Sequence, residues 1–137
     1  MNITLPAQVN HPGFLFVLVT GGREFNNDEG MLDDALDRVD QLATAAGLAM
    51  VVVQGGASGA DHIACVWADN QDPPKQCITE HADWRAHGRA AGPRRNQLMI
   101  DKHHPDICIA MPGGKGTADM VRRCQAAGIP VFLWTRG

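Results

Sequence analysis

The stretch that decides the fold runs Ile107-Cys108-Ile109-Ala110-Met111-Pro112-Gly113-Gly114-Lys115-Gly116-Thr117-Ala118-Asp119. It begins with a continuous apolar run, which is typical of a strand buried on both faces. A helical pattern follows the glycines, so the stretch predicts a strand-to-helix turn. Three glycines within four positions let the backbone approach an anion closely, and the helix start adds the positive end of its dipole. The turn therefore predicts a phosphate cradle with the carboxylate of Asp119 beside it.

Two turns of the same kind lie earlier in the chain. The apolar run 14–19 ends in Thr20-Gly21-Gly22-Arg23, and the apolar run 48–53 ends in Gln54-Gly55-Gly56-Ala57-Ser58-Gly59-Ala60-Asp61. In open parallel sheets, ligands bind at the carboxyl ends of the strands, near the point where the strand order reverses. We therefore expect the three turns to lie along one edge of a sheet and to share a ligand.

The rest of the chain alternates between strand and helix patterns. Apolar spacing predicts helices over about 28–46, 60–69, 93–103 and 116–127, and strands over 75–80, 106–111 and 129–134. Residues 81–92 read as a long irregular connection. Because parallel strands need crossover connections, the pattern predicts an α/β, three-layer Rossmann-like domain with a mostly parallel five-stranded sheet over 14–137. Residues 1–13 are expected to be an N-terminal tail or edge element.

Composition narrows the class of protein. The 137 residues fit one domain, and neither a membrane span nor a signal-peptide layout is visible, so we expect a cytoplasmic protein with no membrane partner. The cysteines Cys65, Cys77, Cys108 and Cys124 form no CxxC pair and are interpreted as reduced core residues. A net charge of -3 argues against nonspecific coating of nucleic acid. The basic charge is local, since residues 84–95 contain four arginines and no acid.

Arg94 and Arg95 fall in the first turn of a predicted helix that opens at Gly92-Pro93, where positive charge opposes the helix dipole. Such local conflicts concentrate at functional sites. Two other side chains have two possible interpretations each. Trp84 either stacks on a base or folds its loop onto the core. Asp61 either contacts a ligand or provides a favourable negative charge in the first turn of a helix. The glycine turns match neither the dinucleotide fingerprint nor the Walker loop, and no metal-binding spacing is present, so no cofactor or metal is expected.

These motifs, together with Ala82-Asp83-Trp84 followed by Gly88, and Ala91-Gly92-Pro93-Arg94-Arg95-Asn96, resemble the YspA/YpsA-like group of the SLOG superfamily. The resemblance runs from about residue 14 to the C-terminus and implies a Rossmann-like fold that binds a nucleotide or a nucleotide-derived ligand, of the AMP, ADP-ribose or NAD-derivative class, as a sensor or processing domain. It also implies a homo-oligomer. The candidate ligand-binding residues are Gly21, Gly22, Arg23, Gly55, Gly56, Ser58, Gly59, Asp61, Trp84, Arg94, Arg95, Asn96, Gly113, Gly114, Gly116 and Thr117.

Related LOG-type phosphoribohydrolases, which release a base from a nucleoside monophosphate, imply a first alternative. Residues 112–117 match the first part of their PGGxGTxxE motif, Asp119 stands at the first acid of that pattern, and Met120 replaces the second. In this alternative Asp119 stabilises positive charge on the ribose and Arg95 holds the phosphate. The related DprA proteins imply a second alternative, a single-stranded nucleic-acid-binding module. Negative net charge and few aromatic residues disfavour that alternative.

Overall fold

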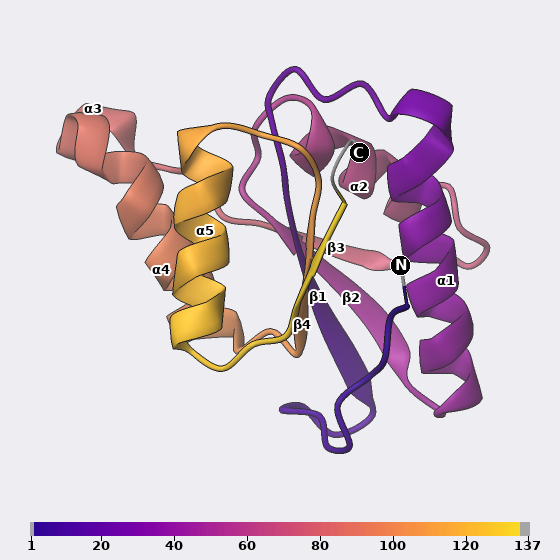
Figure 1. The fold of residues 1–137 in the computed structure, drawn as a ribbon. Coiled ribbons are helices and arrows are strands. Elements are labelled where there is room, and N and C mark those ends of the chain that lie inside the picture. The colour runs from indigo at the N-terminus through magenta and orange to yellow at the C-terminus, as the bar shows by residue number, and fades with distance from the viewer. Residues whose placement is uncertain (1, 135–137) are drawn as a thin grey trace.

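The computed structural model describes residues 2–134, which form a five-stranded sheet with helices on both faces (Figure 1). The strands are β1 (Phe14–Thr20), β2 (Ala49–Gln54), β3 (Gln76–Thr79), β4 (Ile107–Ala110) and β5 (Val131–Leu133). They pair in parallel in the order β3-β2-β1-β4-β5. The predicted α/β class with a parallel five-stranded sheet is confirmed.

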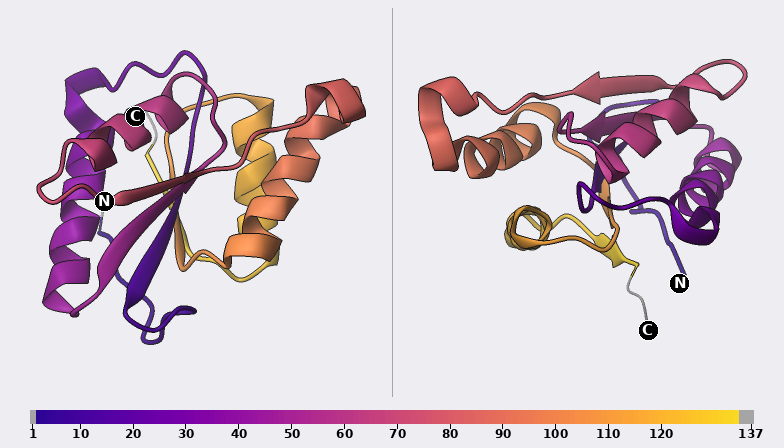
Figure 2. Two further views of the ribbon diagram at one scale, coloured as in Figure 1. Left: turned by 180° about the vertical axis from the view of Figure 1, so that it is seen from behind. Right: turned by 90° about the horizontal axis from the view of Figure 1, so that it is seen from above.

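The helices divide into two layers. They are α1 (Met31–Ala45), α2 (Ala60–Asp69), α3 (Trp84–His87), α4 (Ala91–His103) and α5 (Lys115–Ala126), with 3₁₀ turns η1 (Asp28–Gly30) and η2 (Gly88–Ala90). Figure 2 shows α1 and α2 on one face of the sheet and α4 and α5 on the other. The chain changes faces after β3, so the strand order reverses between β1 and β4. That switch point is where open α/β sheets bind ligands.

Alternate residues of β1 serve the two halves of the core. Val17 and Val19 pack in the cluster that includes α1 and α2, whereas Leu18 packs in the cluster of α4 and α5. All three are buried. A strand covered on both faces needs apolar side chains on both, and this explains the unbroken apolar run.

The N-terminal segment packs against the domain but adds no strand to the sheet. Ile3 is 5% exposed and belongs to the α1 and α2 cluster. The N–H of Asn10 donates to Asp106 Oδ1 at 2.8 Å, and the other oxygen of Asp106 accepts from Phe16 N–H at 2.8 Å. The buried carboxylate of Asp106 therefore links the segment to the amino end of β1.

Two predicted boundaries were wrong for local reasons. The first helix begins at Met31 and not at 28, because Glu29 and Gly30 have φ of 56° and 70°, outside the helical range. Residues 81–92, predicted to be irregular, contain α3 and η2, and α4 already begins at Ala91. The Asp83 carboxylate accepts from Ala86 N–H at 3.0 Å and caps α3, so this helix had a readable start signal. No helix within residues 2–134 combines the length and hydropathy required to cross a membrane.

Candidate functional site

A cavity of about 880 Å³ opens at the carboxyl ends of β1 and β4. Its volume falls within the range of small-molecule sites. Its wall takes residues from all three glycine turns, from the loop after β1, and from the starts of α4 and α5. The three turns therefore lie together, as expected from a parallel sheet. They differ in what their backbone groups contact, and this difference determines what each turn can do.

The first turn uses its glycines for packing. A Cβ on Gly21 would lie 2.6 Å from Ala60 Cβ and 2.9 Å from Met111 Cβ, so any side chain there would collide with the start of α2 and the end of β4. Gly22 donates its N–H to the carbonyl of Pro112 at 2.9 Å. The first and third turns are thereby joined across the switch point.

The second turn is closed by Asp61. The Oδ2 atom of Asp61 accepts from the N–H groups of Gly55 and Ala57, both at 3.2 Å. The N–H of the intervening Gly56 donates to Gln54 Oε1 at 2.6 Å. These three donors are satisfied within the protein, so these N–H groups are not free to bind an anion in this conformation.

Asp61 itself is 7% exposed. Burial raises the pKa of its carboxyl group, while the hydrogen bonds from Ala57 and Gly55 and the charges of Arg95 and Arg23 oppose the rise. The carboxylate of Asp61 thus accepts hydrogen bonds from the second glycine turn and lies near the positive charges of Arg95 and Arg23.

The third turn is open. Gly114 is the N-cap of α5 and supplies no side-chain cap, and the first N–H groups of an α-helix have no acceptor within the helix. A Cβ on Gly114 or Gly116 would meet nothing within 4 Å, whereas one on Gly113 would overlap Thr117 Oγ1. Lys115 is exposed on the cavity wall. The N–H groups at the start of α5, the positive end of its dipole and the exposed Lys115 therefore all border open space, which is what an anion site requires.

The side chain of Arg95 packs against the second glycine turn at Gly55. Its guanidinium donates to the carbonyl of Gly55, to Asn96 Oδ1 at 3.1 Å and to the carbonyl of Glu80 at 3.5 Å. Burial lowers the pKa of Arg95, and the charge of Asp61 opposes this. A Cβ on Gly55 would overlap the guanidinium, so the glycine makes room for the arginine. Arg95 therefore forms a fixed part of the cavity wall.

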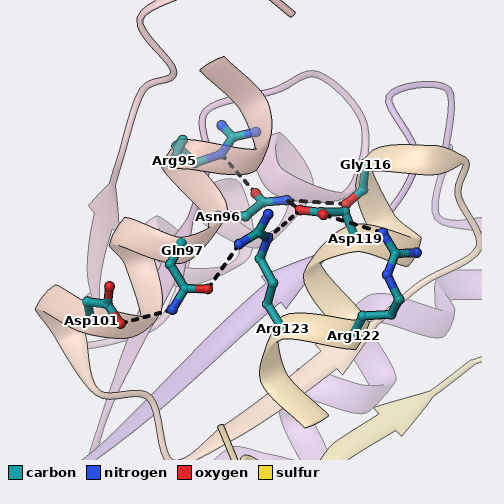
Figure 3. Close-up of polar contacts among 8 residues, drawn as sticks. All are labelled: Arg95, Asn96, Gln97, Asp101, Gly116, Asp119, Arg122 and Arg123. Atoms are coloured by element: carbon teal, nitrogen blue, oxygen red, sulfur yellow. Dashed lines mark hydrogen bonds and ion pairs between the residues drawn. The ribbon is translucent and has the colours of Figure 1, made fainter. Parts of the chain in front are cut away.

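Asp119 belongs to a polar network between α4 and α5 (Figure 3). Its Oδ2 accepts from Arg123 Nε at 2.8 Å and from Asn96 Nδ2 at 3.0 Å, and its Oδ1 accepts from Arg122 at 3.4 Å. Burial favours a higher pKa for Asp119, but the hydrogen bonds from Arg123 and Asn96 and the arginine charges outweigh it and hold the pKa below its usual value. The side chain is 16% exposed and still reaches the cavity wall.

Trp84 is half exposed and lies on the cavity wall. The guanidinium of Arg23 lies over its ring, 5.6 Å from the centroid. The Cη2 atom at the edge of the ring approaches Gly92, where a Cβ would be 3.4 Å away. The tryptophan is thus not folded into the core, and its ring forms an aromatic surface beside the opening.

Most predicted ligand-binding residues line the cavity, and four do not. Gly56, Ser58, Gly59 and Arg94 lie outside its wall. Gly59, with φ of 74°, is pressed against the carbonyl of Gly22, and Ser58 donates to the carbonyl of Arg23 at 3.1 Å. The predicted residues on the wall are Gly21, Gly22, Arg23, Gly55, Asp61, Trp84, Arg95, Asn96, Gly113, Gly114, Gly116, Thr117 and Asp119.

Sequence reasoning missed two cations of the cavity wall, Arg89 and Lys115. Both had a signal, because Arg89 belongs to the basic stretch and Lys115 stands inside the third glycine turn. Residues 2–134 contain no group of three or more His, Cys, Asp or Glu side chains arranged to hold a metal ion.

Comparison with known proteins identifies the family to which this chain belongs. The "Gene 61 protein" of Mycobacterium phage D29 is 38% identical over 121 residues, which cover 85% of this chain and 93% of the phage protein. A family model described as "YspA, cpYpsA-related SLOG family" matches residues 15–87, which contain the first two glycine turns and α3. The chain belongs to the YspA, cpYpsA-related SLOG family.

Proposed function

We propose that the protein binds a nucleotide or nucleotide-derived ligand, of the AMP, ADP-ribose or NAD-derivative class, in the cavity at the carboxyl edge of the sheet, as a sensor or processing domain. The observation that carries the proposal is the uncapped start of α5 at Gly114, which opens into a cavity of about 880 Å³. Membership of the SLOG family, to which a nucleotide-related role is attributed, supports the same class of ligand.

Each part of such a ligand has a complementary surface. A phosphate accepts hydrogen bonds from the first N–H groups of α5, and Lys115 adds charge. A base stacks on the exposed ring of Trp84, which Arg23 covers in this conformation. The second turn takes no part in phosphate binding, because Asp61 already occupies two of its N–H groups.

The contacts of Asp119 favour binding over hydrolysis. A general acid or base must exchange a proton near neutral pH, and the pKa of Asp119 is held below its usual value by Arg123 and Asn96. A fixed negative charge is able to stabilise a positive ribose, but this one already interacts with two arginines. We therefore assign Asp119 to the architecture of the site and keep phosphoribohydrolase activity as the alternative to be tested.

A ligand panel tests the proposal. Isothermal calorimetry with AMP, ADP-ribose, NAD, cyclic nucleotides and short oligonucleotides should detect at least one nucleotide ligand, and chromatography of the same mixtures should detect no free base. Binding of the oligonucleotides alone would replace this function with nucleic-acid binding. Release of base that disappears in Asp119→Asn would replace it with N-glycosidase activity.

Substitutions at Gly114 locate the phosphate. Its φ of -101° lies outside the left-handed region, and its surroundings have space for a side chain, so Gly114→Asp and Gly114→Asn both fit as N-caps. Each should leave stability unchanged or raise it by about a few tenths of a kcal/mol. The aspartate places a negative charge where the phosphate binds, so AMP affinity should fall at least about tenfold further than in the asparagine variant.

Gly114→Ala serves as the control, since it fills the same space without a polar group, and adenosine serves as the uncharged ligand. If Gly114→Asp and Gly114→Asn weaken AMP equally, or if adenosine binding falls as much as AMP binding, the phosphate does not lie at α5.

A further inference from the structure

The two oxygens of the Asp61 carboxylate have different surroundings. Oδ2 is fixed by the N–H groups of Gly55 and Ala57, but Oδ1 accepts no hydrogen bond from any residue in 2–134. Within that described range, His11 Nδ1 is the one fully enclosed side-chain nitrogen or oxygen atom that lacks a partner. Asp61 Oδ1 is therefore not fully enclosed, and Asp61 is a residue of the cavity wall.

The surroundings of Asp61 favour a particular kind of partner. Because Asp61 is only 7% exposed, little water reaches its carboxylate, and the open oxygen gains from a hydrogen-bond donor. An anion is disfavoured there, since two of the nearby N–H groups are taken and the carboxylate itself repels it. A neutral hydroxyl group satisfies the oxygen without a repulsive charge.

The layout of the cavity indicates which hydroxyl group of the ligand faces Asp61 Oδ1. The proposed function, on which this inference rests, assigns the phosphate to the start of α5 and the base to Trp84. The sugar between them is the part of a nucleotide left to face Asp61. A ribose presents hydroxyl donors there, and a deoxyribose lacks one of them.

We propose that Asp61 Oδ1 accepts a hydrogen bond from a ribose hydroxyl of the ligand, so that the site selects ribonucleotides over deoxyribonucleotides. Asp61 then has two roles at once. One oxygen holds the second glycine turn in shape, and the other reads the sugar. A site built to hydrogen-bond a hydroxyl rejects the analogue that lacks it, because a buried polar group is then left without a partner.

Calorimetry with AMP, 2′-deoxy-AMP, 3′-deoxy-AMP and IMP tests the proposal. The wild-type protein should bind AMP about 10- to 100-fold more tightly than at least one deoxy analogue. IMP, which keeps the ribose and changes the base, should not show this loss. In Asp61→Asn the amide oxygen retains the contact to the turn and an amide nitrogen replaces Oδ1. The nitrogen can only donate to the hydroxyl, without the charge of the carboxylate, so the ratio of AMP to deoxy-AMP affinity should fall.

Asp34→Asn is the matched control, because it removes the same charge from an exposed position of α1 away from the cavity wall. It should keep the wild-type discrimination. The wild-type comparison needs no variant, so it remains decisive even if Asp61→Asn does not fold.

Four results would overturn the inference. AMP that binds no better than both deoxy analogues removes the hydroxyl contact and leaves the proposed function intact. Unchanged discrimination in Asp61→Asn assigns the contact to another residue. A preference for AMP over IMP that is lost in Asp61→Asn, with no loss for the deoxy analogues, assigns Asp61 to the base. If AMP does not bind at all, the inference fails. Calorimetry with ADP-ribose and NAD then tests separately whether the proposed function fails as well.

Discussion

Replacement of Asp119 by asparagine should destabilise the packing of α4 on α5. The carboxylate holds Arg123 and Asn96 on one oxygen, at 2.8 and 3.0 Å, and Arg122 on the other at 3.4 Å. An asparagine of the same shape keeps an oxygen toward the first two donors and turns its amide nitrogen toward Arg122. The geometry survives, and the negative charge is lost.

The magnitude follows from these contacts. A hydrogen bond to a charged group contributes about 1.5–3 kcal/mol and a neutral one about 0.5–1.5 kcal/mol, so loss of the charge costs about 1 kcal/mol at the bond from Asn96. The bond from Arg123 keeps its charged donor and loses about the 0.3–0.5 kcal/mol of an i,i+4 ion pair. Arg123 is one-third exposed, which screens its share, and the contact to the exposed Arg122 adds little. We expect Asp119→Asn to lose about 1–2 kcal/mol, or about 5 °C in Tm for a domain of this size.

Urea unfolding across a range of pH measures this loss and its origin. The pKa of Asp119 is lower in the folded than in the unfolded state, so its stabilisation is complete above the unfolded value of about 3.9 and is lost as the pH falls through the folded value. The difference between wild type and Asp119→Asn should be constant from pH 6 to pH 8 and should shrink below about pH 4.

An exposed carboxylate of the same helix pair provides the control. Asp101 accepts from the neutral Gln97 at 2.9 Å, so Asp101→Asn should cost no more than about 0.5 kcal/mol. If Asp119→Asn is as stable as this control, or if its deficit is the same at pH 3.5 and pH 7, Asp119 does not hold the two helices together. Loss of ligand binding at unchanged stability would move Asp119 from the architecture of the site to the ligand.

Two further predictions concern positions outside the cavity. Gly59→Ala should lose about 3 kcal/mol or more in urea unfolding, because its φ of 74° disfavours an L side chain and the new Cβ overlaps the carbonyl of Gly22. A loss no larger than that of Gly114→Ala, which enters open space, would contradict this. Ile3→Ala should cost about 2–3 kcal/mol, because Ile3 is 5% exposed in the core. A change below about 0.5 kcal/mol would mean that the segment does not pack in solution.

The sheet was predictable because its three central strands, β1, β2 and β4, are covered on both faces and therefore form apolar runs that lead into the glycine turns. The position of the cavity followed from parallel pairing alone. The local signals that were missed concern side chains that bond to the backbone. Asp83 caps α3 within a stretch predicted to be irregular, and Asp61, in the first turn of α2, bonds back to the glycine turn before it, yet in the sequence each is only a single acid near a helix start. Arg94 and Arg95 are adjacent in sequence, but a helix turns about 100° per residue, so Arg95 lines the cavity and Arg94 does not.

The three glycine turns look alike in sequence, and their roles separate only when each missing Cβ is considered. At Gly21 a Cβ meets the start of α2, at Gly55 it meets Arg95, and at Gly114 it meets nothing. The first turn therefore needs glycine for packing, the second for passage of a charged side chain, and the third leaves open space. A cradle requires donors that are both unpaired and approachable, and of the three turns only the third has an uncapped helix start that faces open space. Of three turns that look equivalent in sequence, the geometry therefore favours one as the anion site that we propose, and in the same proposal the Asp61 carboxylate contacts the neutral part of the ligand.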